Sequence, residues 1–166
     1  VVKAGAFGVI RVIYDVFGID RVTELGVGTP LAALASFTII WGSLRALQQT
    51  EIKKRLAYST VSQVSYIALG AALAQPAAAL GAILHLIHQG IMKITLFFCA
   101  GAFAETLGVK TVSGLNGAGV RMPGASAAFS VAALGMIGVP PTAGFVTKWF
   151  LGTGALAAES GWVVAV

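Results

Sequence analysis

The feature that most constrains this chain is a long, mostly apolar stretch at residues 76–105, which carries a lysine, Lys93, near its middle. A membrane-spanning helix needs roughly 20 apolar residues, so this stretch is long enough to cross a bilayer. A lysine at the centre of such a helix costs roughly 2.5–3.5 kcal/mol on insertion scales. A purely structural helix would carry leucine or alanine there, so Lys93 indicates a path for ions or protons.

The composition places the whole chain in a membrane. Hydrophobic residues make up 57% of it and charged residues 10%, whereas ordinary globular domains are about 25% charged. We predict an all-α, polytopic transmembrane helix bundle. Glycines, prolines and charged stretches divide it into segments at about 1–17, 30–49, 51–74, 76–105 and 124–158, the last with a break at 139–144.

Both ends of the sequence look cut. The chain begins at Val1 without an initiator methionine, and residues 162–166 stop inside an apolar stretch. We therefore expect residues 1–166 to be a fragment of one larger membrane domain.

Positive charge predicts the orientation. Cytoplasmic loops of membrane proteins carry an excess of lysine and arginine. The two loops that we assign to the cytoplasm hold Arg45, Lys53, Lys54, Arg55, Lys110 and Arg121. The opposite loops hold only Arg21, and the polar stretch 106–123 is expected to be a loop. Segment 51–74 is rich in serine and threonine, which favours a closely packed interior helix over a pore lining.

A stripe of titratable and polar residues runs along the segment that contains Lys93. At about 100° per residue, His85, Gln89 and Lys93 lie at i, i+4 and i+8 on one face, and His88 broadens that face. Such a stripe suits proton transfer through intervening waters, because histidine titrates near neutral pH and lysine changes its protonation readily when desolvated. The alternative for His88 is a hydrogen bond to a neighbouring helix.

The last segment is interrupted by two consecutive prolines. Pro140 and Pro141 have no N–H, so the carbonyls of Met136 and Ile137 lose their helical donors. Broken helices of this kind mark ion sites in transporters. Lys148 lies about two turns beyond the break, where it either joins the ion path or extends to the membrane interface.

Several other classes are excluded or unsupported. We find no phosphate-binding glycine motif, no cysteine cluster and no serine–histidine–aspartate arrangement, and Cys99 is the single cysteine. The two histidines lack acidic or cysteine partners nearby, so no metal or cofactor is expected. The net charge of +5 is spread between apolar segments, which argues against nucleic acid.

Three ordered motifs resemble a known family. They are TEIKKRLAYSTVS at 50–62, HLIHQGIMKITLFFCAG at 85–101 and GMIGVPPTAGFVTKWFL at 135–151. The first is similar to the family stretch TDIKRLLAYSSVS, the second to its lysine-bearing helix and the third to its broken helix. Together they resemble the antiporter-like, proton-translocating membrane subunits of respiratory complex I and of Mrp-type multisubunit Na⁺/H⁺ antiporters.

The resemblance implies an inverted-repeat fold with a proton path through Lys3, His85, Lys93 and Lys148. Gln89 stands where the family often has histidine. Lysine at position 148 resembles the D-type protein of Mrp antiporters more than the complex I protein that carries glutamate there.

Two functions follow from the resemblance. The first is proton conduction in an Mrp-type antiporter, and the alternative is a proton-pumping membrane subunit of NADH-quinone oxidoreductase. A third hypothesis is a non-conducting scaffold. The first two imply partner membrane subunits, protons and Na⁺ as candidate ions, and a multi-pass location in a bacterial inner membrane.

Overall fold

The computed structural model describes residues 2–166, and Val1, the first residue of the predicted segment 1–17, lies outside the described residues. The regular structure of the described chain is helical, with loops between the helices and one isolated antiparallel bridge. Its elements are α1 Val2–Arg11, η1 Val12–Phe17, α2 Ile19–Glu24, α3 Gly28–Leu47, α4 Ile52–Ala72, α5 Pro76–Leu107, η2 Ser113–Leu115, α6 Ala118–Arg121, α7 Pro123–Ile137, α8 Ala143–Ala157 and η3 Gly161–Ala165. The predicted all-α helix bundle is confirmed.

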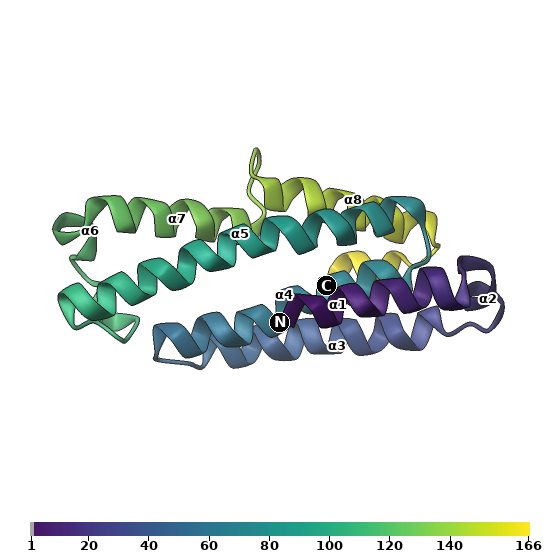
Figure 1. Ribbon diagram of the computed structural model, residues 1–166, viewed down its shortest axis with the longest axis horizontal. Helices are drawn as coiled ribbons and strands as arrows, with labels where there is room; N and C mark the ends of the chain where they lie inside the picture. Colours follow the sequence, from purple (N-terminus) through teal and green to yellow (C-terminus); the bar gives the residue numbers. More distant parts are fainter. Residues whose placement is uncertain (1) are drawn as a thin grey trace.

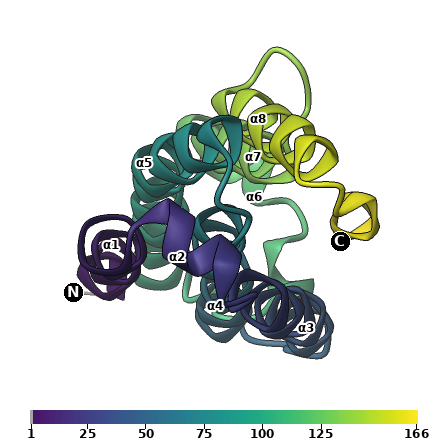
Figure 2. The ribbon, with the colours of Figure 1, turned by 90° about the vertical axis from the view of Figure 1, so that its right-hand side faces the viewer.

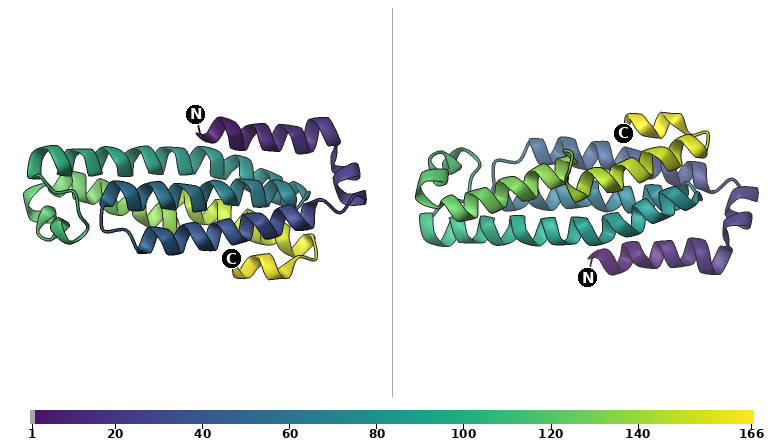
Figure 3. Two further views of the ribbon diagram at one scale, coloured as in Figure 1. Left: turned by 90° about the horizontal axis from the view of Figure 1, so that it is seen from below. Right: turned by 90° about the horizontal axis from the view of Figure 1, so that it is seen from above.

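The bundle is built around α4 and α5, which run antiparallel beside one another (Figure 1). Helix α3 packs on the far side of α4, and α7 and α8 line up end to end along α5 (Figure 2). Helix α1 lies along the α4–α5 pair and connects through α2 to the start of α3 (Figure 3). Side chains on the facing surfaces of α4 and α5 therefore lie in the middle of the molecule.

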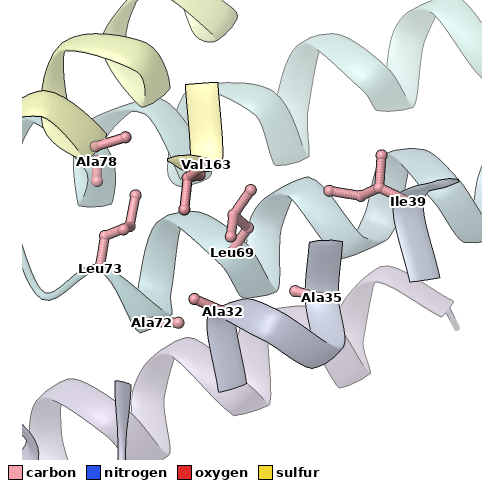
Figure 4. Close-up of a cluster of buried hydrophobic side chains, with 9 residues drawn as sticks. Ala32, Ala35, Ile39, Leu69, Ala72, Leu73, Ala78 and Val163 are labelled. Carbon is pink, nitrogen blue, oxygen red and sulfur yellow. The ribbon is translucent and has the colours of Figure 1, made fainter. Parts of the chain in front are cut away.

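Small residues allow the helices to approach closely. A Cβ at Gly42 of α3 would lie 3.0 Å from the backbone nitrogen of Ser62 on α4, and the hydroxyls of Ser43 and Ser62 are hydrogen-bonded at 2.9 Å. The neighbouring apolar cluster is likewise rich in alanine (Figure 4). Helix α4 is thus the packed interior helix that its hydroxyl residues predicted.

The first predicted segment changes its winding at Val12. Residues 2–11 form an α-helix, whereas residues 12–17 form a wider π-helix that ends at Gly18, where φ is +78°.

The stretch expected to be a loop at 106–123 needs correction, because it holds the short helices η2 and α6. Helix α6 starts after Gly117, whose φ of +79° turns the chain and which glycine adopts at little cost.

The last predicted segment is broken, as its prolines indicated. Helix α7 ends at Gly138, whose φ is +88°, and α8 begins at Ala143. Pro140 and Pro141 lie exposed in the connection, which projects from the bundle between the two helices (Figure 1). A backbone excursion of this kind divides one long span into two half-helices.

The two basic loops meet at one end of the bundle. The backbone N–H of Ile52 donates to the carbonyl of Lys110 at 3.0 Å, and that of Val112 donates to Thr50 at 2.9 Å. These bonds join the start of α4 to the stretch that follows α5. The loops predicted to share one side of the membrane therefore do lie together.

The distribution of exposed residues fits a lipid environment. By length and composition, α3 and α5 are apolar enough to span a bilayer, and α7 is a shorter apolar helix. Large apolar side chains point outward, including those of Phe37, Trp41, Ile91, Phe98 and Trp149. The polar stripe of α5 is turned inward, which is the reverse of the pattern in a water-soluble protein.

Candidate functional site

The predicted stripe on α5 lies in the interior of the bundle. The exposed fraction is 1% for His85, 0% for Gln89 and 6% for Lys93. All three residues project from successive turns of one helix, as their spacing requires. An apolar helix that buries these groups in its core places them where lipid cannot reach and neighbouring helices can bind them.

Lys93 is held by neutral oxygens of α4. Its Nζ donates to the carbonyl of Leu56 at 3.1 Å and to the hydroxyl of Ser59. The Ser59 hydroxyl in turn donates to the same carbonyl at 2.9 Å. Carboxylate partners are absent within residues 2–166, where the ion pairs are Arg11–Asp15 and Lys54–Glu51. Lys93 is therefore oriented without being fixed in one charge state by a counter-ion.

His85 links α5 to α8. Its Nδ1 lies 3.1 Å from the Oγ1 of Thr147, and the Thr147 hydroxyl donates to the carbonyl of Gly144 at 2.9 Å. Because that hydroxyl hydrogen is engaged, Thr147 is left to accept from Nδ1–H, which assigns the hydrogen to Nδ1. The other ring nitrogen, Nε2, is buried without a hydrogen-bond partner among the described residues.

Lys148 lies at the helix break. Its Nζ donates to the carbonyl of Ile137 at 2.9 Å, one of the two carbonyls that Pro140 and Pro141 leave without a helical donor. The ammonium also lies 5.4 Å from the ring centroid of Tyr66 on α4, within cation–π range. The ring of Tyr66 is 5.8 Å from that of His85. His85, rather than Lys93, is thus the member of the stripe nearest to Lys148.

Lys3 approaches α5 from α1. Its Nζ donates to the carbonyl of Leu86 at 3.2 Å, and a Cβ at Gly90 would collide with that Nζ. Gly90 therefore leaves room for Lys3 beside the turn between His85 and Gln89. Lys3 therefore contacts the helix that carries the stripe, but on a different face of that helix.

His88, Pro140 and Pro141 are the remaining predicted site residues, and they lie outside the buried stripe of α5. His88 is half-buried, and its Nδ1 has no hydrogen-bond partner in the described part of the chain. Pro140 and Pro141 are exposed and contribute through the break, not through contact with the stripe. No group of three metal-ligating side chains is found within residues 2–166.

Sequence reasoning missed the facing side chains of α4 and α8. Ser59, Gln63 and Tyr66 occur at i, i+4 and i+7, the helical spacing of the α5 stripe, and this matching period was the signal that could have found them. Thr147 gave no such signal, because its role depends on how α8 packs against α5.

Taken together, the buried residues Lys93, Gln89 and His85 and the half-buried Lys148 form one line of polar side chains. Its members are two amines, an amide and an imidazole, and apolar side chains surround the bundle. Such a line can pass protons between neighbouring groups.

The sequence matches one protein family along its whole length. The family described as NADH:quinone oxidoreductase/Mrp antiporter, TM, matches residues 1–166. The chain is 40% identical to NADH-quinone oxidoreductase subunit N of Desulforudis audaxviator, covering 99% of this chain and 32% of that protein. It is 32% identical to F(420)H(2) dehydrogenase subunit N of Methanosarcina mazei, covering 80% of this chain and 29% of that protein. The chain therefore spans about a third of the length of the curated relatives it matches.

Solved structures give the same result. The chain superposes on the Mrp complex from Dietzia sp. with a TM-score of 0.88 and 31% identity, covering 98% of this chain and 30% of that one. A membrane-bound sulfane sulfur reductase, an archaeal respiratory complex, has the same TM-score at 29% identity, covering 98% and 33%. With the broken helix and the buried lysine stripe, these matches show that the chain belongs to the family of antiporter-like integral membrane subunits shared by NADH:quinone oxidoreductases and Mrp antiporters.

Proposed function

We propose that this chain conducts protons through the membrane along the line Lys93, Gln89, His85 and Lys148. The observation that carries the proposal is the burial of Lys93, at 6% exposure, against neutral oxygens of α4. An amine with no carboxylate partner in the described chain can take up and release a proton without breaking an ion pair.

The geometry supports an order for the groups. Lys93 lies toward the end of the bundle where the basic loops meet, and His85 lies two turns further along α5. Tyr66 and Thr147 connect His85 with the neighbourhood of Lys148. In this proposal a proton enters near Lys93 from the cytoplasmic side and leaves past Lys148. Lys3, on α1, contributes to the path where it contacts α5.

The curated relatives favour a more specific function, in which this chain is one subunit of a redox-driven complex. They include subunits N and M of NADH-quinone oxidoreductases and a subunit of an F(420)H(2) dehydrogenase. In such a complex, electron transfer in other subunits would drive proton movement through this one. The chain would lie in the cytoplasmic membrane and contact further membrane subunits.

An Mrp-type Na⁺/H⁺ antiporter is the second candidate. The observation in its favour is Lys148 at the helix break, which resembles the D-type Mrp protein, together with the superposition on the Mrp complex from Dietzia sp.. In that assembly the proton gradient would drive Na⁺ export, and this chain would supply the proton path.

Proton uptake into inverted membrane vesicles tests the proposal. Vesicles that carry the full-length protein in its complex should show either donor-driven acidification or Na⁺-induced proton release, and vesicles with Lys93→Ala should lose that activity. Acidification driven by NADH or another reduced electron donor identifies the redox-driven complex, whereas proton release on addition of Na⁺ identifies the antiporter. Proton conduction along this line is contradicted when Lys93→Ala leaves unchanged whichever of these two activities the wild-type complex shows.

A further inference from the structure

An exposed arginine in the last turn of α3 is held between two aromatic rings. The guanidinium carbon of Arg45 lies 5.8 Å from the ring centroid of Trp41, one turn earlier on α3, and 5.9 Å from that of Tyr58 on α4. Both distances are within cation–π range. The two rings come from helices that pack against each other. The position of this charge is therefore set by tertiary packing as well as by its own helix.

The guanidinium of Arg45 has donors left for a ligand. It forms no ion pair within residues 2–166, and Glu51, the acidic residue nearest to it in the sequence, is paired with Lys54 at 3.0 Å. Within the same residues its side chain donates one hydrogen bond, from Nη1 to the amide oxygen of Gln48 at 3.3 Å. A guanidinium carries five N–H donors in a fixed fork that matches the oxygens of a phosphate. Most of these donors remain free to bind an anion.

The carbonyls at the C-terminus of α3 would repel an anion, but Arg55 of α4 binds two of them. Its Nε donates to the carbonyl of Ala46 at 3.2 Å, and its Nη2 donates to that of Leu47 at 2.8 Å. The negative end of the helix dipole is thereby compensated by a second guanidinium. Positive charge therefore dominates at this end of α3.

An apolar surface runs along α3 from this arginine toward the middle of the bundle. It consists of Leu34, Phe37, Trp41 and Leu44, which lie at i, i+3, i+7 and i+10 and are between 53% and 65% exposed; we call it the outer face of α3. Helix α3 packs against α4 with its other side (Figure 2). From Leu34 to Arg45 the helix rises about 16 Å, close to half of the roughly 30 Å hydrocarbon core. The outer face therefore spans the depth of one leaflet.

The position of these groups selects a lipid as the ligand. Arg45 lies at the end of the bundle where the basic loops meet, which we predict to face the cytoplasm. Tryptophan and tyrosine are enriched at the level of the lipid headgroups, and the cytoplasmic leaflet carries the anionic lipids. A phospholipid in this leaflet can place its phosphate on the guanidinium and an acyl chain on the outer face of α3. A soluble phosphate would leave that apolar face uncovered.

We propose that Arg45, Trp41 and Tyr58 bind the phosphate of one anionic phospholipid from the cytoplasmic leaflet, and that its acyl chain lies along the outer face of α3. This lipid site does not rest on the proposed function, because α3 packs on the far side of α4 from α5 and its buried stripe.

Photo-crosslinking in the complete complex tests the site. The full-length protein in its complex is placed in phosphatidylcholine nanodiscs with a trace of phosphatidylglycerol that carries a diazirine in one acyl chain, and labelled residues are identified by mass spectrometry. We expect labelling on the outer face of α3. Added phosphatidylglycerol should displace the probe, whereas the same amount of added phosphatidylcholine should not. Equal displacement by the two lipids overturns the proposal.

Substitutions distinguish a specific site from general attraction to positive charge. Arg45→Gln should raise the amount of probe needed for half-maximal labelling by on the order of tenfold, the effect of one lost hydrogen bond to a charged group. The matched control is Arg121→Gln, which removes an exposed charge at the same end of the bundle (Figure 1). Arg121 has no aromatic ring in cation–π contact within residues 2–166, so its variant should label like the wild type. Equal weakening by the two variants overturns the proposal.

Two variants of Tyr58 test the aromatic part of the site. Tyr58→Phe keeps the ring and should label like the wild type, whereas Tyr58→Leu removes it and should weaken labelling. This pair decides the question even where Arg45→Gln prevents assembly, and equal labelling of the pair overturns the role of the rings. A cryo-electron microscopy map of the complete complex with a protein helix on the outer face of α3, in place of lipid, overturns the whole proposal.

Discussion

At the scale of the residue, the amines of the buried Lys93 and the half-buried Lys148 are the groups whose chemistry matters most. Lys93 is bound by a carbonyl and a hydroxyl, and Lys148 by a carbonyl and an aromatic ring. The carbonyl and hydroxyl oxygens can accept from the nitrogen in either charge state, whereas the contact with the ring requires the positive charge. A carboxylate would instead favour the charged form.

Lys93 should be the least replaceable residue of α5. We expect Lys93→Ala in the full-length protein to abolish proton transport, because no other amine contacts Leu56 and Ser59 in the described chain. Assembly should be retained, since removing a charge from an apolar helix lowers its insertion cost. Vesicle acidification and the yield of intact complex are the measurements. Lys54→Ala is the matched control, because Lys54 is exposed and paired with Glu51. Loss of assembly in Lys93→Ala would point to a structural role.

At Lys148 the choice of substitution separates two roles. Arginine keeps the charge and the hydrogen bond to Ile137 but does not readily deprotonate. If Lys148 must cycle its proton, Lys148→Arg should lose transport almost as completely as Lys148→Ala. Near-wild-type acidification with arginine would instead show that a fixed positive charge at the break is sufficient.

At the scale of the element, the helix break depends on an unusually close approach of backbone. Gly144 at the start of α8 lies against Gly135 near the end of α7, so that a Cβ at Gly144 would collide with the carbonyl oxygen of Gly135. The two half-helices overlap there, and the Thr147–Gly144 hydrogen bond that orients His85 belongs to the same turn.

Gly144→Ala should therefore disturb both stability and transport. Overpacking of this kind costs about 1–3 kcal/mol, because backbone cannot move aside as a flexible side chain can. The thermal midpoint of the purified complex should fall, and acidification should fall with it. Gly152→Ala, two turns further along α8, is the control, since a Cβ there meets nothing within 4 Å. Equal stability of the two variants would contradict the close approach.

The elements also show what could and could not be predicted from the sequence. The inward stripe of α5 was predictable, because i, i+4 and i+8 spacing on an apolar helix leaves one face for polar groups. The break was predictable because prolines remove donors. The shared face of Ser59, Gln63 and Tyr66 could have been found from their spacing, but their pairing with residues of α5 could not, since it depends on the register between α4 and α5. That register is set by tertiary packing, which no local pattern records.

At the scale of the whole molecule, the basic loops lie at one end and α2 lies at the other (Figure 1). We predict that the basic end faces the cytoplasm. In a variant with Cys99→Ala, a cysteine at Ser113 should react with a membrane-impermeant thiol reagent only from the cytoplasmic side. A cysteine at Glu24 should react only from the other side, and both native residues are exposed. Gly28 is unsuitable as a label site, because a Cβ there would lie 2.5 Å from the carbonyl oxygen of Ala72. Labelling of both positions from one side would refute this topology.

The bond between Lys148 and Ile137 has a mechanical consequence. The ammonium of α8 occupies the acceptor of α7 that a peptide N–H would fill in a continuous helix, so one side chain joins the two halves of the span. A hydrogen bond from a charged donor is roughly twice as strong as one between neutral groups. Loss of the proton from Lys148 would weaken the joint between the half-helices, while the backbone connection through residues 138–142 would stay intact. If Lys148 carries protons as we propose, its charge also controls how firmly the two halves of the span are held together.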